Sequence, residues 1–207
     1  MPFKLFSFIF VVFFLSFPLF AEEFIEGRHY RVLDTPKAKQ KEIREYFSFH
    51  CAPCYSQQSF MKELERGMPR RAKFVKNHVD GVEGQDPAAE KLLTKAVITA
   101  EKMRMKDKVV KALFERIQKQ KQSFDTVEDI RALFISLGGS EFMFDSTFNS
   151  FSMDMMLEET LKNTELVRAA GEKSVPTLII NGKYKPLTGR ITSMAQYKDL
   201  IYYLLRK

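Results

Sequence analysis

The segment Cys51–Cys54 constrains the fold most, because it lies where one periodicity gives way to another. Before it, apolar residues alternate with polar ones, which is typical of a β-strand. After it, apolar residues recur at helical spacing up to Arg66, and Gly67 and Pro69 end the helix. A second alternating segment follows at 72–79. A strand, a helix and a strand in this order predict a parallel pair and an α/β fold.

The strand before the cysteines carries a charged residue on its apolar face. Glu45 shares that face with the alternate apolar residues of 43–49. A buried carboxylate is costly unless it is paired or protonated, and such groups tend to serve proton transfer. We therefore predict that Glu45 pairs with Lys76 on the next strand and accepts the proton of Cys54. The alternative is that the strand has the opposite phase and Glu45 is solvated.

The two cysteines of the chain are separated by only Ala52 and Pro53. A disulfide across so small a loop restrains the unfolded chain very little, so a structural role explains it poorly. At a helix start, free N–H groups and the helix dipole stabilise a thiolate. We predict that Cys51 is the nucleophile and Cys54 the resolving thiol.

Two neighbours of the cysteines have candidate supporting roles. His50, when protonated, would further stabilise the thiolate, and the alternative is a histidine that merely ends the strand. Pro53 fixes its own φ angle and lacks an N–H, so it stiffens the active loop, begins the helix, or does both.

Other uses of a cysteine pair do not fit this sequence. Covalent haem attachment requires histidine directly after the second cysteine, and residue 55 is Tyr. A structural zinc site requires four ligands, and His29, His50 and His78 lack finger-like spacing. We therefore expect no bound metal and no cofactor beyond the redox-active disulfide Cys51–Cys54 itself.

Between residues 86 and 170 the apolar period is close to 3.6 almost throughout, which predicts four or five helices. The expected boundaries are a start at Asp86-Pro87, a capping box at Asp125 and Glu128, a stop at Gly138-Gly139 and a new start at Ser140. We interpret 85–170 as a helical domain inserted in an α/β domain that comprises 22–84 and 171–207.

The α/β character resumes after residue 174. Pro176 to Ile180 is an apolar run, and Asn181-Gly182 predicts a two-residue hairpin turn before a return strand at 183–187. Ser193 is expected to cap a last helix. The inner side of that helix is predicted to consist of Met194, Leu200, Ile201, Leu204 and Leu205.

The first residues predict export. After Lys4 the chain has no charge up to Ala21, and this apolar stretch is short for a membrane span. We interpret 1–21 as a signal peptide cleaved after Ala21, which places the mature chain in the periplasm; an uncleaved anchor is the alternative. Lys and Arg outnumber Asp and Glu by 33 to 26, but they are spread along the chain, so we expect no nucleic-acid partner.

Taken together, three segments resemble the DsbA family of bacterial periplasmic oxidases: Glu45–Tyr55, Ser174–Thr177 and Asn181–Tyr184. The resemblance extends over essentially the whole mature chain, and it implies a thioredoxin fold with an inserted helical domain. It also implies a cis peptide bond between Val175 and Pro176, beside the cysteine pair. The backbone of Val175 would then pair with an extended substrate segment.

The resemblance further implies a monomeric enzyme that transfers its disulfide to reduced or unfolded exported proteins. Its reoxidant would be a quinone-linked membrane protein of the DsbB type. The chain departs from the family at Ala52-Pro53, where the family has Pro-His and thioredoxin has its proline in the same place as here. Because the family's histidine helps to stabilise the reduced form, a reductase or isomerase on the same fold is the first alternative.

A peptide-binding chaperone is the alternative from another class. Segment 85–170 is rich in methionine and phenylalanine, which form either an adaptable apolar surface or, more commonly, a core. The residues concerned are Met143, Phe144, Phe148, Phe151, Met153, Met155 and Met156.

Overall fold

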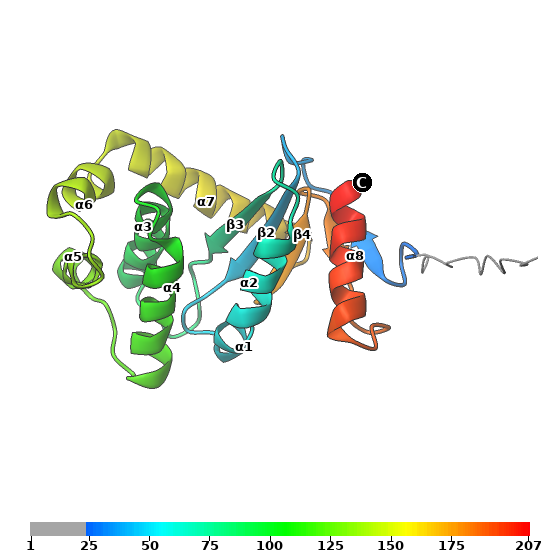
Figure 1. The fold of residues 1–207 in the computed structure, drawn as a ribbon, viewed down its shortest axis with the longest axis horizontal. Helices are drawn as coiled ribbons and strands as arrows, with labels where there is room; N and C mark the ends of the chain where they lie inside the picture. Colours follow the sequence, from blue (N-terminus) through cyan, green and yellow to red (C-terminus); the bar gives the residue numbers. More distant parts are fainter. Residues whose placement is uncertain (1–23) are drawn as a thin grey trace, which may run out of the picture.

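A five-stranded mixed sheet forms the centre of the structure (Figure 1). The structure is a computed structural model that describes residues 24–207, and the predicted signal peptide lies outside them. The strands lie in the order β1-β5-β4-β2-β3, with β2 and β3 parallel, as predicted, and β4 antiparallel to β2. Their bounds are β1 Tyr30–Val32, β2 Glu42–Phe47, β3 Lys73–His78, β4 Thr177–Ile180 and β5 Tyr184–Pro186.

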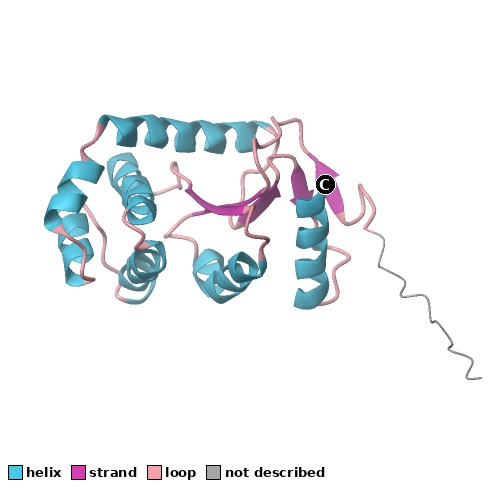
Figure 2. Cartoon of the chain, turned by 45° about the horizontal axis from the view of Figure 1, so that its top comes forward, coloured by secondary structure: helices cyan, strands magenta, loops and turns pink. Residues whose placement is uncertain are grey.

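Helices cover both faces of the sheet (Figure 2). On one side lie α1 (Ala52–Ser56), α2 (Gln58–Gly67) and α8 (Met194–Arg206), and α7 (Phe151–Ala169) crosses the other. The helices between β3 and β4 are α3 (Pro87–Lys102), α4 (Lys106–Phe114), the π-helical turn η1 (Glu115–Lys119), α5 (Val127–Ser136), α6 (Glu141–Phe148) and α7. The predicted α/β fold with a helical insertion is confirmed.

Most of the predicted boundaries of the inserted helices are confirmed by capping contacts. The Asp86 carboxylate accepts a hydrogen bond from the Ala88 N–H at 3.0 Å, and Ser140 caps α6. Gly138 has a φ of 88°, a left-handed conformation that suits glycine at a helix end.

The capping box predicted at Asp125 and Glu128 is wrong by one residue. Thr126 Oγ1 accepts from the Asp129 N–H at 3.1 Å, and the Asp129 carboxylate accepts from the Thr126 N–H at 3.2 Å. Aspartate therefore replaces the expected glutamate as the acidic member. The Asp125 carboxylate instead accepts a hydrogen bond from the Ser123 hydroxyl at 2.7 Å.

The helix predicted from Cys51 to Arg66 is interrupted at Gln57. The Gln58 side-chain amide donates to the Cys54 carbonyl at 3.0 Å, and Ser56 Oγ donates to the Pro53 carbonyl at 3.0 Å. Side chains that bind helix carbonyls disturb the i to i−4 ladder, which is a known cause of kinks. The cysteine pair therefore occupies a short first segment, α1, of its own.

The predicted hairpin after β4 is confirmed, but its return strand, β5, is shorter than 183–187, and three residues separate the strands because Ile180 pairs with Tyr184. Asn181 and Gly182 have φ angles of 52° and 73°, the left-handed conformation that Asn-Gly favours in a hairpin turn. Asn181 is buried, and its side chain accepts from the Glu42 N–H at 3.1 Å and donates to the Leu204 carbonyl at 3.1 Å. The turn thereby connects β2 to the end of α8.

The inner side of α8 is confirmed except at its first residue. Leu200, Ile201, Leu204 and Leu205 are buried in the core formed with β2, β4 and α2. Met194 was predicted to join them and is 57% exposed. The first turn of α8 extends beyond the part that packs on the sheet.

The methionine-rich and phenylalanine-rich residues of the insertion divide between core and surface. Phe144, Phe148 and Met153 are buried, and Met156 is partly buried. The remaining members, Met143, Phe151 and Met155, are exposed by 48%, 81% and 59%. Neither the core interpretation nor the surface interpretation is therefore right for the whole set.

Aromatic packing joins the end of β2 to the inserted helices. The ring of Phe49 lies 4.7 Å from that of Phe114 in α4 and 5.2 Å from that of Phe47, measured between centroids. Cys54 is buried in the same cluster. The helical insertion thus forms the apolar wall behind the cysteine pair.

We predict that Phe114→Ala lowers the free energy of unfolding by about 3 to 5 kcal/mol, because it opens a cavity between sheet and insertion. Urea denaturation of the oxidised protein measures this change. Phe142→Ala is the matched control, since Phe142 is 77% exposed and its loss is expected to cost about 0.5 kcal/mol or less. Equal losses in the two variants would contradict the assignment of Phe114 to the core.

Candidate active site

The cysteine pair lies at the junction of β2 and α1. Cys51 is the N-cap of α1, and its sulfur accepts a hydrogen bond from the Cys54 N–H at 3.1 Å. The two residues form a disulfide in which Cys51 is partly exposed and Cys54 is fully buried. An incoming thiolate can therefore reach the first sulfur but not the second.

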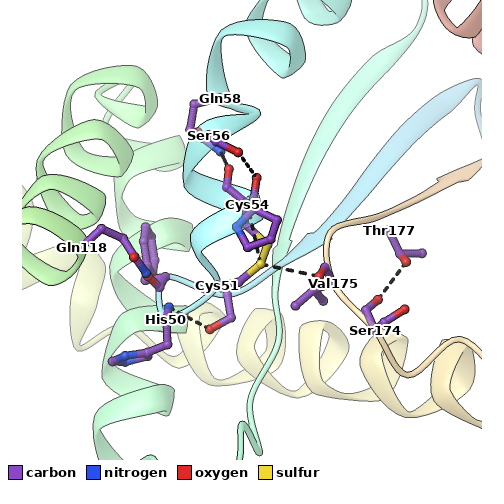
Figure 3. The surroundings of a disulfide bond; sticks show 12 residues. His50, Cys51, Cys54, Ser56, Gln58, Gln118, Ser174, Val175 and Thr177 are labelled. Carbon is purple, nitrogen blue, oxygen red and sulfur yellow. Dashed lines mark hydrogen bonds between the residues drawn. A yellow bond between two sulfur atoms is a disulfide. The ribbon is translucent and has the colours of Figure 1, made fainter. Parts of the chain in front are cut away.

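The loop before β4 lies beside the disulfide (Figure 3). The peptide bond between Val175 and Pro176 is cis, as the resemblance implied. The Val175 carbonyl oxygen lies 3.5 Å from Cys51 Sγ. A backbone acceptor thus adjoins the reachable sulfur.

The predicted pairing of Glu45 with Lys76 is confirmed. The two residues are register partners on β2 and β3, and Lys76 Nζ lies 2.5 Å from Glu45 Oε2. Glu45 is fully buried, so the strand phase inferred from the alternation is right and the solvated alternative is wrong. Lys76 reduces the cost of this buried carboxylate.

Gln58 connects this ion pair to the cysteines. Its Oε1 accepts from Lys76 Nζ at 3.3 Å, and its Nε2 donates to the Cys54 carbonyl at 3.0 Å. A continuous set of polar contacts therefore leads from Glu45 to the backbone of the buried cysteine. No sequence signal indicated this role, because glutamine near a helix start has no distinctive pattern.

The side chain of His50 points away from the disulfide, toward the inserted helices (Figure 3). Its Nε2 lies 3.3 Å from Oε1 of Glu90 in α3. On the preceding residue, the Phe49 carbonyl accepts from the Gln118 side chain at 2.6 Å. The insertion thus contacts the loop before Cys51 through two polar side chains.

Glu90 was missed by the sequence reasoning, although a signal was present. It shares one helix face with Leu93, Thr94 and Val97, at spacings of three, four and seven residues. All four are buried. A carboxylate on a helix face that otherwise carries no charged residue is the same kind of anomaly that identified Glu45.

His78, at the end of β3, is fully buried beneath Phe49. Its Nδ1 shares a 2.9 Å hydrogen bond with the Thr94 hydroxyl. Burial, with a smaller effect from the charge of His50, lowers the pKa of His78 to about 3. His78 is therefore neutral in the folded protein near pH 7, whereas in the unfolded chain it gains a proton below about pH 6.5.

From this we predict an acid-sensitive contribution to stability. Between about pH 6.5 and pH 3 the unfolded state binds a proton that the folded state does not, so stability falls as the pH falls. His78→Phe removes the group, and the loss of unfolding free energy from about pH 6 to pH 4 should shrink by about 2 kcal/mol. Denaturant unfolding across this range measures the slope. Parallel curves for the two proteins would show that His78 does not contribute.

Residues 24–207 contain neither a metal-binding cluster nor a membrane-spanning helix. No set of three or more histidine, cysteine, aspartate and glutamate side chains in this part of the chain is arranged to bind a metal ion. No helix within it is long and apolar enough to cross a membrane.

A disulfide at the start of a helix, on a thioredoxin-like sheet and beside a cis-proline loop, defines a thiol-disulfide oxidoreductase of the thioredoxin class. Comparison with known proteins identifies the family within that class. The sequence profile of the DSBA-like thioredoxin domain matches residues 82–201. The chain belongs to the DsbA family.

Similarity to individual members of the family extends over nearly the whole chain. The thiol:disulfide interchange protein DsbA of Pectobacterium carotovorum is 30% identical over 204 residues, which cover 93% of this chain and 94% of the relative. DsbA of Escherichia coli K12 is 31% identical over 202 residues with the same coverage. Among solved structures, DsbA of Proteus mirabilis has a TM-score of 0.73 at 29% identity, covering 89% of this chain and 98% of its own.

Proposed function

We propose that this chain donates its Cys51–Cys54 disulfide to cysteine pairs of newly exported proteins in the periplasm. The observation that carries the proposal is the asymmetry of the pair, with Cys51 reachable at the helix start and Cys54 buried. Membership of a family whose relatives are named thiol:disulfide interchange proteins supports the same reaction.

The exchange proceeds in two displacements. A client thiolate attacks Cys51 Sγ, the bond to Cys54 breaks, and Cys54 leaves as a thiolate that takes up a proton. A second client thiolate then attacks the client sulfur of the mixed disulfide, and Cys51 leaves as a thiolate. The client loses two electrons to the cysteine pair. The N–H of Cys54, 3.1 Å from Cys51 Sγ, stabilises the departing thiolate.

The surrounding residues support this cycle. We propose that Glu45, paired with Lys76, exchanges the proton of Cys54, and that Val175 binds an extended client segment by backbone pairing beside Pro176. In support, a Proteus mirabilis DsbA with a TM-score of 0.76 to this chain was solved with a bound peptide. Reoxidation by a quinone-linked membrane protein of the DsbB type completes the cycle, and the protein acts as a monomer without a cofactor.

Ala52-Pro53 favours a second candidate on the same fold, a reductase or isomerase, because the loop has no histidine between the cysteines. The reduction potential against glutathione decides between the two. We expect a value closer to that of DsbA, about −120 mV, than to that of thioredoxin, about −270 mV. A thioredoxin-like value would eliminate the oxidase.

The Cys51→Ala variant tests the chaperone alternative. If this variant, which lacks the reactive thiol, still protected client proteins, the function would be that of a chaperone.

We predict that Glu45→Gln slows the attack of Cys54 on the mixed disulfide by about tenfold or more near pH 7 and changes its pH dependence, since the proton acceptor is removed. Stopped-flow release of a model peptide from Cys51 measures this rate. Glu42→Gln is the matched control, because Glu42 is buried on the same strand and pairs with Arg44 instead. Equal pH profiles in wild type and Glu45→Gln would contradict the role.

A further inference from the structure

Glu90 is a buried carboxylate whose one polar side-chain contact, within residues 24–207, is with His50. It is 1% exposed, and its Oε1 lies 3.3 Å from His50 Nε2. No group in the described part of the chain donates a hydrogen bond of good geometry to either carboxylate oxygen. Leaving an ionised carboxylate so poorly paired would be costly, so the pair favours states in which a proton lies between the two side chains.

The position of the pair connects it to the redox centre. His50 directly precedes Cys51, and Glu90 belongs to the inserted helix α3. The Gln118 side chain donates to the Phe49 carbonyl at 2.6 Å, and the Cys51 N–H donates to the Ser48 carbonyl at 3.2 Å, so the loop is held on both sides of His50. A change in the charge of the pair therefore occurs against the residue next to Cys51 and needs no rearrangement of the loop.

The other titratable groups around the pair determine where its proton lies. Burial, reinforced by the negative charge of Asp80, raises the pKa of Glu90 to about 7. Burial lowers the pKa of His50. Asp80 pairs with Arg168 of α7, and His78 is neutral near pH 7. Both shifts place the shared proton on the carboxyl group, which can donate to the neutral imidazole.

We propose that Glu90 is a positioning residue of the redox centre. Glu90 and His50 together hold one proton, and the charge behind Cys51 depends on whether that proton is present. The inference rests on the proposed function in requiring that Cys51 becomes a thiolate when the disulfide is reduced. While the pair keeps its proton it is neutral, and when it loses the proton a negative charge remains on buried Glu90. Thiolate formation and proton loss therefore oppose each other.

The experiment is an NMR titration of the His50 imidazole in the oxidised and reduced wild-type protein. We expect an inflection near pH 7 that lies about 0.5 pH unit higher in the reduced protein, equivalent to about a threefold change in proton affinity. Thiolate absorbance, recorded on the same reduced sample, shows separately whether Cys51 is ionised. An inflection at the same pH in both redox states, with the thiolate present, would overturn the inference.

Glu90→Gln provides the second test. The amide still reaches His50 but cannot become negative, so the inflection near pH 7 should disappear in both redox states. The reduction potential should also vary less steeply between about pH 6.5 and pH 8 than in wild type. Persistence of either feature would show that His50 alone titrates and that Glu90 has only a structural role.

Glu101→Gln is the matched control for this variant. Glu101 is exposed near the far end of the same helix, so its substitution removes the same formal charge at a distance from His50. Glu101→Gln should leave the inflection near pH 7 and the pH dependence of the reduction potential as in wild type. A reduction potential like that of thioredoxin would refute the proposed oxidase. The expected difference in the His50 inflection between the oxidised and the reduced protein would remain, so failure of the proposed function is distinguishable from failure of this inference. If Glu90→Gln does not fold, the wild-type comparison alone decides.

Discussion

The packing of Phe47 and Phe49 against Phe114 is the interaction on which the rest of the structure depends. β2 begins as an ordinary central strand, paired with β3 on one side and β4 on the other. At its carboxyl end its side chains leave the sheet core and enter the core of the inserted helices. Because Cys51 follows directly, the position of the reactive sulfur is determined by two layers of structure at once.

This arrangement explains why two cysteines so close in sequence have different chemical environments. Cys51 remains at the surface as the N-cap of α1, whereas one helical turn brings Cys54 into the apolar cluster of the insertion. Disulfide exchange requires this difference, since one sulfur must be attacked by a partner and the other must be protected until it acts within the molecule. The helical insertion is thus a part of the active site as well as a cover for one edge of the sheet.

Sequence periodicity predicted the features that depend on local patterns. The alternation over 43–49 indicated the buried phase of Glu45, and Asn181-Gly182 indicated the hairpin. The interruption at Gln57, the exposure of Met194 and the contact between His50 and Glu90 depend on partners that are distant in sequence or on side-chain bonds to the backbone. Hydrophobic patterns contain no information on such bonds. Glu90 is an intermediate case. Its position on a largely apolar helix face can be read from the sequence, but its contact with His50 cannot.

The location of the titratable groups has a consequence for this member of the family. The dipeptide between its cysteines, Ala52-Pro53, has no ionisable side chain, so no charge between the sulfurs can tune the thiolate. Ionisable groups instead lie behind the pair. Glu45 and Lys76 are linked through Gln58 to the backbone of Cys54, and His50, which directly precedes Cys51, contacts Glu90. Both of these acids are almost fully buried, where electrostatic effects are screened less than at the surface. Proton-dependent control of the disulfide in this chain therefore has to act through the scaffold on which the cysteines are held, and that scaffold includes Glu90 of the inserted helices.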